Sequence, residues 1–286
     1  MPELPEVTAL VADLGSRLVG REIKRFDIVS FSALKTFQIS VDVLEGQRIE
    51  GITRHGKFLD LTVGDVHLIM HLARAGWVRW REAAPKPSKA LGRGPLTARL
   101  ILDDGSGFDV TEAGTKKSLA IYLARDPFEV PGIARLGPEP LDAAFTEPEF
   151  ARILAGAGRA QIKGVLRNQS VIAGIGNAYS DEILHVAKMS PFKPASMPPD
   201  DVARLYTALQ STLRDAIARA DGLAASELKA EKKSGMRVHG RTGEPCPICG
   251  DTVRQVIFAD STLQYCPTCQ TGGKPLADRV LSRLLK

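Results

Sequence analysis

Several features that define other classes of protein are missing from this 286-residue sequence. No cysteine occurs before position 246, so disulfides cannot hold the long N-terminal part together. No run approaches the ~20 apolar residues of a membrane-spanning helix. The N-terminus is polar and acidic, unlike a basic and then apolar leader. These absences argue against a disulfide-rich secreted domain and a membrane protein, and they predict a cytoplasmic protein without a membrane partner.

The composition is that of a folded protein, with 44% hydrophobic and 25% charged residues. Its length predicts two domains of ordinary size. The net charge of +5 and the pI of about 9.0 are compatible with a polyanionic partner without requiring one.

All four cysteines lie near the C-terminus, in "CPIC" and "CPTC". Sixteen residues separate the two pairs, a spacing typical of a tetrahedral zinc site. Two disulfides are the alternative, and they fit poorly with a cytoplasmic chain that has no other cysteine. The sequence therefore predicts one structural zinc ion, held by Cys246, Cys249, Cys266 and Cys269.

The first part of the chain is predicted to contain one helix followed by strands. Apolar residues recur at helical spacing from Val7 to Leu18, and Pro5 with Glu6 suits the helix start. Next, "KFLDLTV" and "VHLIMHL" flank Gly64–Asp65, which is a two-residue hairpin signal. "TARLILDD" and "FDV" flank a second turn, so short strands with regular turns predict a sandwich or barrel.

The later part of the chain is predicted to be helical up to the cysteines. One helix is expected on each side of "GIG", and the second is expected to begin at Ser180, Asp181 and Glu182. Residues 83–95 hold prolines and basic residues and predict a mobile loop. The predicted parts are a sheet domain (1–125), a proline-rich interdomain linker (126–148), a helical domain (149–239), a zinc module (240–270) and a basic tail (271–286).

The N-terminus itself is a candidate reagent. Methionine before a small residue such as proline is normally removed, which would expose the secondary amine of Pro2. The positive potential at a helix start disfavours protonation of that amine, and a neutral amine can attack a sugar or carbonyl carbon. Glu3 could then supply or accept a proton. The alternative is that "PELPE" only begins a helix, and taken alone this alternative is favoured.

Two further segments could contact a ligand. Lys57 follows a glycine at a strand entrance, where it could act as an acid or base or bind phosphate. Asn177 in "GIGN", with the neighbouring amides, could hold one phosphate, and Lys163 and Arg167 add positive charge before it. Solvent-exposed lysines and a plain connection between helices are the alternatives for these segments.

Together these motifs resemble the formamidopyrimidine-DNA glycosylase/endonuclease VIII family of base-excision repair enzymes. The resemblance rests on "MPELPEV", "HGKFL", "RLGPEPL", "GIGNAYSDEIL" and "VHGRTGEPCPICG…QYCPTCQ", in this order from residue 1 to about 270. It implies an α+β multidomain fold: a helix and β-sandwich in one domain, and a helix–two-turn–helix element with a four-cysteine zinc finger in the other. Double-stranded DNA would lie in a basic cleft between them, with the damaged nucleotide flipped out.

The resemblance also implies residue roles. Pro2 would be the nucleophile at C1′, Glu3 the proton donor for base release, and Lys57 an aid to β-elimination. Glu6, Lys163 and Asn177 are predicted to contact the DNA, and the resemblance places Asn177 at a phosphate beside the lesion.

Four departures from the family pattern bear on the substrate. "HLARAG" puts Arg74 where family members carry a methionine that fills the space left by the flipped base. "TEAGTKKSLA" replaces the loop that completes this filling, so Lys116, Lys117 or Arg74 would substitute. Ser261 occupies the zinc-finger position at which family members carry an arginine that contacts phosphate and is linked to δ-elimination. Without that arginine, β-elimination alone is expected. The segment before "VHGR" is shorter than the corresponding segment of typical family members, which forms a lid over 8-oxoguanine. This difference weakens the expectation that 8-oxoguanine is the preferred substrate.

With the resemblance, the expectation is a monomeric DNA glycosylase with abasic-site lyase activity, in the cytoplasm or at the nucleoid. A non-catalytic binder of damaged or distorted DNA is the first alternative. A zinc-ribbon interaction module fused to an unrelated enzyme is the second.

Overall fold

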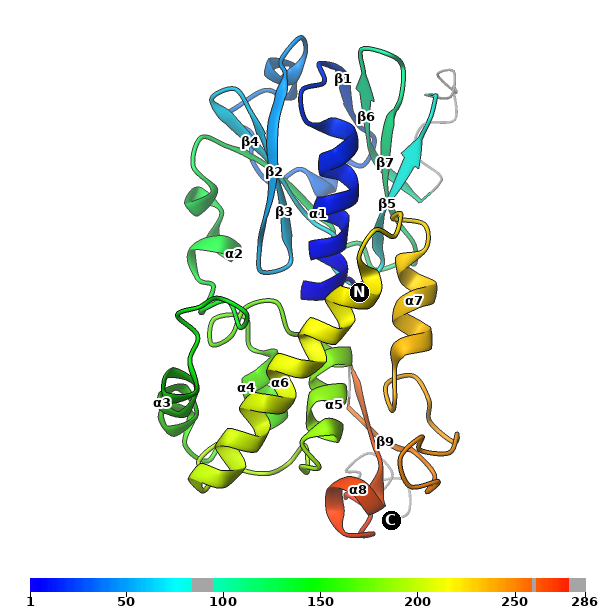
Figure 1. Ribbon diagram of the computed structural model, residues 1–286. Helices are drawn as coiled ribbons and strands as arrows, with labels where there is room; N and C mark the ends of the chain where they lie inside the picture. The colour runs from blue at the N-terminus through cyan, green and yellow to red at the C-terminus, as the bar shows by residue number, and fades with distance from the viewer. Residues whose placement is uncertain (84–94, 259–260, 278–286) are drawn as a thin grey trace. The chain divides into compact units, whose positions relative to one another are not determined.

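The computed structural model describes residues 1–83, 95–258 and 261–277 (Figure 1). Residues 84–94 of the predicted loop and residues 278–286 of the predicted tail lie outside the described residues. The chain divides into two compact units. Unit 1 contains Met1–Leu136 and Ala220–Lys229, and unit 2 contains Gly137–Arg219 and Ala230–Lys286.

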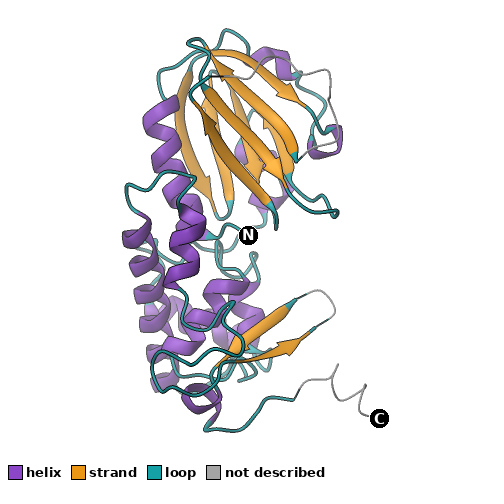
Figure 2. Cartoon of the chain, turned by 90° about the vertical axis from the view of Figure 1, so that its right-hand side faces the viewer, coloured by secondary structure: helices purple, strands orange, loops and turns teal. Residues whose placement is uncertain are grey.

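Unit 1 is a helix with a β-sandwich (Figure 2). One four-stranded antiparallel sheet has the order β1-β6-β7-β5, and the other has the order β2-β3-β4-β8. Its elements are α1 (Leu4–Leu18), β1 (Ile23–Ile28), β2 (Ile49–His55), β3 (Phe58–Val63), β4 (Val66–His71), β5 (Gly76–Arg81), β6 (Leu96–Leu102), β7 (Gly107–Glu112), β8 (Ala120–Ala124) and α2 (Pro131–Ala134), with 3-10 turns η1 (Phe31–Ala33), η2 (Val41–Leu44) and η3 (Pro127–Glu129).

The core of unit 1 follows from the alternation along its strands. Leu59, Leu61 and Val63 of β3 point to the side that packs against α1 and the second sheet, so they are buried with the apolar face of α1. Gly64 adopts φ 57° in the tight turn between β3 and β4, a conformation that glycine takes without strain. The predicted β-sandwich is therefore confirmed.

A short segment distant in sequence completes unit 1. The indole Nε1 of Trp77 donates to the backbone oxygen of Ala225 (2.9 Å), and the Ala225 amide donates to Asp13 Oδ2 (2.9 Å). Lys229 Nζ lies 4.6 Å from the centre of the Trp77 ring. Residues 220–229 fall within the range 149–239 predicted for the helical domain, but these contacts place them in unit 1.

Unit 2 consists of helices and one zinc-finger hairpin. Its core is formed by apolar residues of α3, α4, α5 and α6. Its elements are α3 (Glu147–Ala157), α4 (Ile162–Arg167), α5 (Asn177–Val186), α6 (Pro199–Ala220), α7 (Leu228–Gly235), β9 (Arg254–Ile257), β10 (Thr262–Tyr265) and α8 (Pro267–Thr271), with the ends of α6 and α7 reaching into unit 1. Across the described ranges, no helix combines the length and apolarity that a membrane crossing requires.

The boundaries around "GIGN" differ from the sequence expectation. The helix α4 ends at Arg167, so an irregular connection separates it from "GIGN". The helix α5 begins at Asn177, with Gly176 as its N-cap, which places Ser180, Asp181 and Glu182 inside the helix. These three polar side chains are buried. They form hydrogen bonds with other parts of unit 2 and do not cap the helix.

Candidate functional site

The start of α1 buries two acidic side chains. Glu3 is the N-cap, and Glu3 and Glu6 form a reciprocal capping box in which the Glu3 amide donates to Glu6 Oε2 (2.9 Å). Pro2, Glu3 and Glu6 are all buried. Glu3 therefore serves the helix start in addition to being the candidate proton donor. Glu6 positions Glu3, and a contact of Glu6 with DNA stays a prediction.

Lys57 lies in the turn between β2 and β3 with only 7% of its surface exposed. Nearby, burial and the positive charge of Lys57 lower the pKa of His71 to about 4, so this imidazole is neutral at pH 7. The His71 ring also lies 4.6 Å from that of Phe58. Sequence reasoning gave His71 no role. Its position at the strand end beside Lys57 was the missed signal.

The three basic residues expected to fill the space of a flipped base lie in two turns of unit 1. Arg74 is exposed in the turn between β4 and β5. Lys116 and Lys117 are exposed in the segment between β7 and β8. Lys117 Nζ donates to the Glu112 carbonyl, while the buried Glu112 carboxylate accepts the Ser118 amide (2.7 Å). Glu112 thereby organises the segment that carries both lysines.

Lys163 is buried inside unit 2. Its side chain is 6% exposed, and its Nζ donates to Asp181 Oδ1 (2.6 Å), Ser180 Oγ (2.8 Å) and the Asn177 carbonyl (3.2 Å). The charge is thus neutralised inside unit 2 by the carboxylate of Asp181. Lys163 thus fixes the first turns of α5, and its contact with DNA stays a prediction.

Asn177 lies at the start of α5 and contacts the zinc-finger hairpin. Its Nδ2 donates to the carbonyl oxygen of Thr262 (2.7 Å). Its Oδ1 is buried and has no hydrogen-bond partner among the residues that the structure describes. A buried acceptor without a donor is costly, and the N-terminal end of a helix favours anions. Asn177 therefore joins α5 to the finger at the end of the helix best suited to phosphate.

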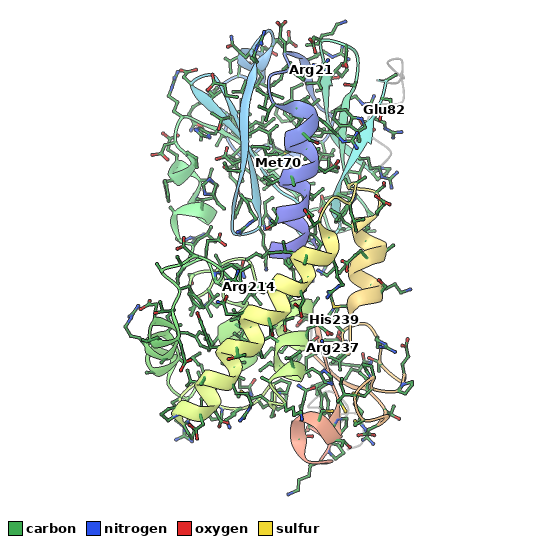
Figure 3. The ribbon with its side chains drawn as sticks, in the orientation of Figure 1. Arg21, Met70, Glu82, Arg214, Arg237 and His239 are labelled. Carbon is green, nitrogen blue, oxygen red and sulfur yellow. The ribbon has the colours of Figure 1, made fainter. Side chains whose placement is uncertain are left out.

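Side chains in the middle of α5 bind residues 237–239, the segment that leads into the zinc finger (Figure 3). Asp181 Oδ2 bonds to Nδ1 of His239 at 2.8 Å. The Glu182 carboxylate accepts the amides of Arg237, Val238 and His239, at 2.8, 3.0 and 2.8 Å. Burial raises the pKa of Glu182, while these three amides favour its charged form. Sequence reasoning interpreted Asp181 and Glu182 as helix-start residues and missed this docking role.

The four cysteines form one cluster whose sulfur atoms all lie within 4.8 Å of one another. Cys249 Sγ lies 3.4 Å from Cys266 Sγ, and Cys246 Sγ lies 3.9 Å from Cys269 Sγ. Zinc–sulfur bonds of about 2.3 Å in a tetrahedron separate the sulfurs by about 3.8 Å, so the geometry fits zinc. The four thiolates hold one structural zinc ion, as the cysteine spacing predicted.

His185 adds a buried neighbour to this zinc site. It is 3% exposed, and its Nε2 lies 3.3 Å from Cys246 Sγ. Burial, with a smaller effect of Arg237, lowers the pKa of His185 to about 4. A neutral imidazole can donate one N–H to a thiolate, which is the usual support of a zinc ligand by its surroundings. The sequence gave no signal for this contact, because His185 and Cys246 are far apart along the chain.

Family models match three consecutive parts of the chain. The formamidopyrimidine-DNA glycosylase N-terminal domain matches residues 1–113, its H2TH domain matches residues 136–227, and the zinc finger found in FPG and IleRS matches residues 243–272. These matches agree with the motifs that carried the resemblance.

Individual relatives extend the match to nearly the whole chain. A formamidopyrimidine-DNA glycosylase of Symbiobacterium thermophilum is 35% identical over 94% of this chain and 89% of its own length. An uncharacterised formamidopyrimidine-DNA glycosylase-like protein of Mycobacterium tuberculosis is 59% identical over 53% of this chain and 94% of its own length. A complex of the Lactococcus lactis Fpg with abasic-site DNA is 28% identical, with a TM-score of 0.80, over 94% of this chain and 99% of that chain.

Proposed function

The chain belongs to the formamidopyrimidine-DNA glycosylase family of enzymes, and we propose that it is a bifunctional DNA glycosylase and abasic-site lyase. It would excise a damaged base from double-stranded DNA and then cleave the strand by β-elimination. We propose further that it acts as a monomer in the cytoplasm or at the nucleoid. The observation that carries this proposal is the buried pair of Pro2 and Glu3 at the start of α1.

The chemistry begins with removal of Met1, since the Pro2 nitrogen is otherwise part of an amide. The free secondary amine attacks C1′ of the damaged nucleotide, forming a C1′–N bond while the bond to the base breaks. Glu3 gives a proton to the departing base. The positive potential at the start of α1 favours the neutral, nucleophilic amine over its protonated form.

The second step cleaves the strand. Ring opening breaks the C1′–O4′ bond, and O4′ takes up the proton that the Pro2 amine loses on bonding to C1′. The resulting iminium between Pro2 and C1′ acidifies the hydrogens at C2′. Loss of a C2′ proton breaks the C3′–O bond and releases the 3′ phosphate as the leaving group. Lys57 is the residue proposed to assist, with the neutral imidazole of His71 beside it. Water then hydrolyses the iminium and restores the Pro2 amine.

Unit 2 contributes DNA binding. Asn177 would hold a phosphate with the remaining Nδ2 hydrogen and with the favourable field of the α5 N-terminus. The zinc site supports this contact indirectly, because Thr262, Arg237 and His239 all join the finger region to α5. Arg74, Lys116 and Lys117 remain proposed contacts of unit 1, on their exposure and charge.

The altered residues support a second candidate function, a non-catalytic binder of damaged DNA. Arg74 and the segment with Lys116 and Lys117 depart from the family pattern, and so does Ser261. Such a binder would hold abasic-analogue duplex without cutting it. The presence of Pro2, Glu3 and Lys57 at the matching positions favours the enzyme.

A borohydride-trapping assay on abasic-site duplex distinguishes the two functions. Reduction of the iminium should give a covalent protein–DNA adduct with the wild type and much less with Pro2→Gly, in which a primary amine replaces the proline nitrogen. The wild type should also cut the duplex to a β-elimination product. Failure of the wild type to trap or cut, with binding retained, would establish the binder instead.

A further inference from the structure

The end of the zinc-finger hairpin exposes two consecutive large apolar side chains. Ile257 is 37% exposed and Phe258 is 41% exposed. The Phe258 amide donates to the Ser261 carbonyl (2.8 Å), which closes the hairpin beyond β9 and β10.

The rest of the hairpin buries its apolar residues normally. Val256 and Leu263 are cross-strand partners, 2% and 1% exposed, and they pack with Tyr265. The hairpin thus has its own small core beside Phe192 and Leu276. Ile257 and Phe258 do not belong to that core. Neighbouring exposed apolar residues on an otherwise well-packed module are typical of an interaction surface.

The hairpin end is fixed beside the proposed phosphate contact. Thr262 is the cross-strand partner of Ile257, and the Thr262 carbonyl is the group that accepts from Asn177 Nδ2. Figure 2 shows β9 and β10 as the paired strands of unit 2. A phosphate held at Asn177 therefore places the neighbouring sugar and base within reach of the hairpin end. This step rests on the proposed function.

We propose that Ile257 and Phe258 form an apolar DNA contact that packs against sugars or an unstacked base next to the lesion. Proteins commonly insert phenylalanine or isoleucine at base steps, and aromatic rings stack on exposed bases. Ser261 cannot provide a charge here, so this end of the finger binds through apolar area and not by neutralising phosphate. The ligand is double-stranded DNA with a disrupted base stack.

The chain offers a matched control in the same finger. Ile248 is 61% exposed and lies between the zinc ligands Cys246 and Cys249. Cys246 contacts His185 near the C-terminal end of α5, whereas the hairpin contacts Asn177 at the N-terminal end. Ile248→Ala therefore removes a comparable exposed apolar side chain away from the proposed contact.

The test is the affinity of zinc-loaded protein for duplex containing a stable abasic analogue, measured over a range of salt concentrations. Phe258→Ala should weaken binding about tenfold, the scale of one lost stacking contact. The slope of log affinity against log salt should stay unchanged, because no phosphate contact is lost. Phe258→Trp should keep wild-type affinity, and so should Ile248→Ala.

Three results would overturn the proposal: Phe258→Ala binding as tightly as wild type, a reduced salt slope for Phe258→Ala, or an equal loss with Ile248→Ala. Ser261→Arg provides the complementary measurement, since an added phosphate contact should steepen the salt slope by about one. An unchanged slope with Ser261→Arg would place the hairpin end away from the backbone and contradict the proposal. Borohydride trapping is scored separately, so a failed lyase activity is distinguishable from a failed apolar contact.

Discussion

The two helix starts that carry the proposed chemistry are built in different ways. The start of α1 is a local device, because its N-cap Glu3 and its third helical residue Glu6 satisfy each other within four residues of chain. The start of α5 has no side-chain cap, and its Asn177 instead bonds to Thr262, 85 positions away. The proposed nucleophile therefore depends on a short sequence, while the proposed phosphate contact depends on an intact finger.

Because of this difference, we expect substitutions in the two units to have different consequences. A substitution at the start of α1 should affect chemistry with little effect on unit 2. A substitution in the network of α5 should affect folding, zinc and DNA binding together, because the same helix serves all three. The predictions below follow this division, beginning with the largest expected effect.

Glu3→Gln should reduce base excision by about 10²–10⁴-fold, because glutamine cannot donate the proton that a leaving base needs. Glutamine keeps an acceptor oxygen for the helix cap, so the fold should be preserved. Single-turnover excision from a damaged duplex measures the effect. Trapping on an abasic-site duplex serves as the control and should persist, since no base has to leave. An undiminished excision rate would remove Glu3 from the chemistry.

Lys163→Met should destabilise unit 2 by about 3–5 kcal/mol, because it leaves the buried carboxylate of Asp181 without its cation. Urea unfolding monitored in unit 2 measures this effect. Lys193→Met is the matched control. Lys193 pairs with Asp201 at a partly exposed site, where such pairs contribute about 0–1 kcal/mol. Similar losses for both variants would contradict the role assigned to Lys163.

His185→Leu should weaken zinc binding about 10–100-fold, since it removes the N–H that supports the Cys246 thiolate. Competition with a chromogenic chelator gives the zinc affinity directly. His185→Gln can retain a donor near the position of Nε2 and should restore most of the affinity. Ile183→Val, also buried on α5 but packed in the helical core of unit 2, controls for general loss of stability. Equal zinc affinity in His185→Leu and wild type would exclude the contact.

His71 should make unit 1 less stable at acidic pH. Its folded pKa of about 4 lies below its ordinary value of 6.5, so the folded unit favours the neutral ring. The stabilisation that the neutral ring contributes to the folded unit is complete above pH 6.5 and is lost as the pH falls through about 4. His71→Phe cannot be protonated, so its Tm advantage over wild type should grow from pH 7 to pH 4.5. A constant Tm difference across this range would show that His71 titrates normally.

Sequence patterns predicted what short stretches of chain determine. The hairpin at Gly64–Asp65, the N-terminal helix and the zinc ligands all follow from local spacing, and each is confirmed. The buried role of Lys163 could not be predicted, because a lysine on a helix is ordinarily exposed and its partner Asp181 lies beyond an irregular connection.

Contacts between distant segments explain the other differences. Glu182 accepts amides from residues 237–239, and residues 220–229 join unit 1 through Trp77. Neither contact has a signature in the periodicity or composition of the participating stretches. Both arise only when the chain has brought separate elements together.

The central claim is that the Pro2 nitrogen forms the covalent bond to DNA. The most direct measurement is mass spectrometry of peptides from the borohydride-reduced adduct with an abasic-site duplex. We expect Met1 to be absent and the sugar remnant to be attached at Pro2. A remnant on Lys57 or any other lysine, or a reactive protein that still carries Met1, would contradict the account.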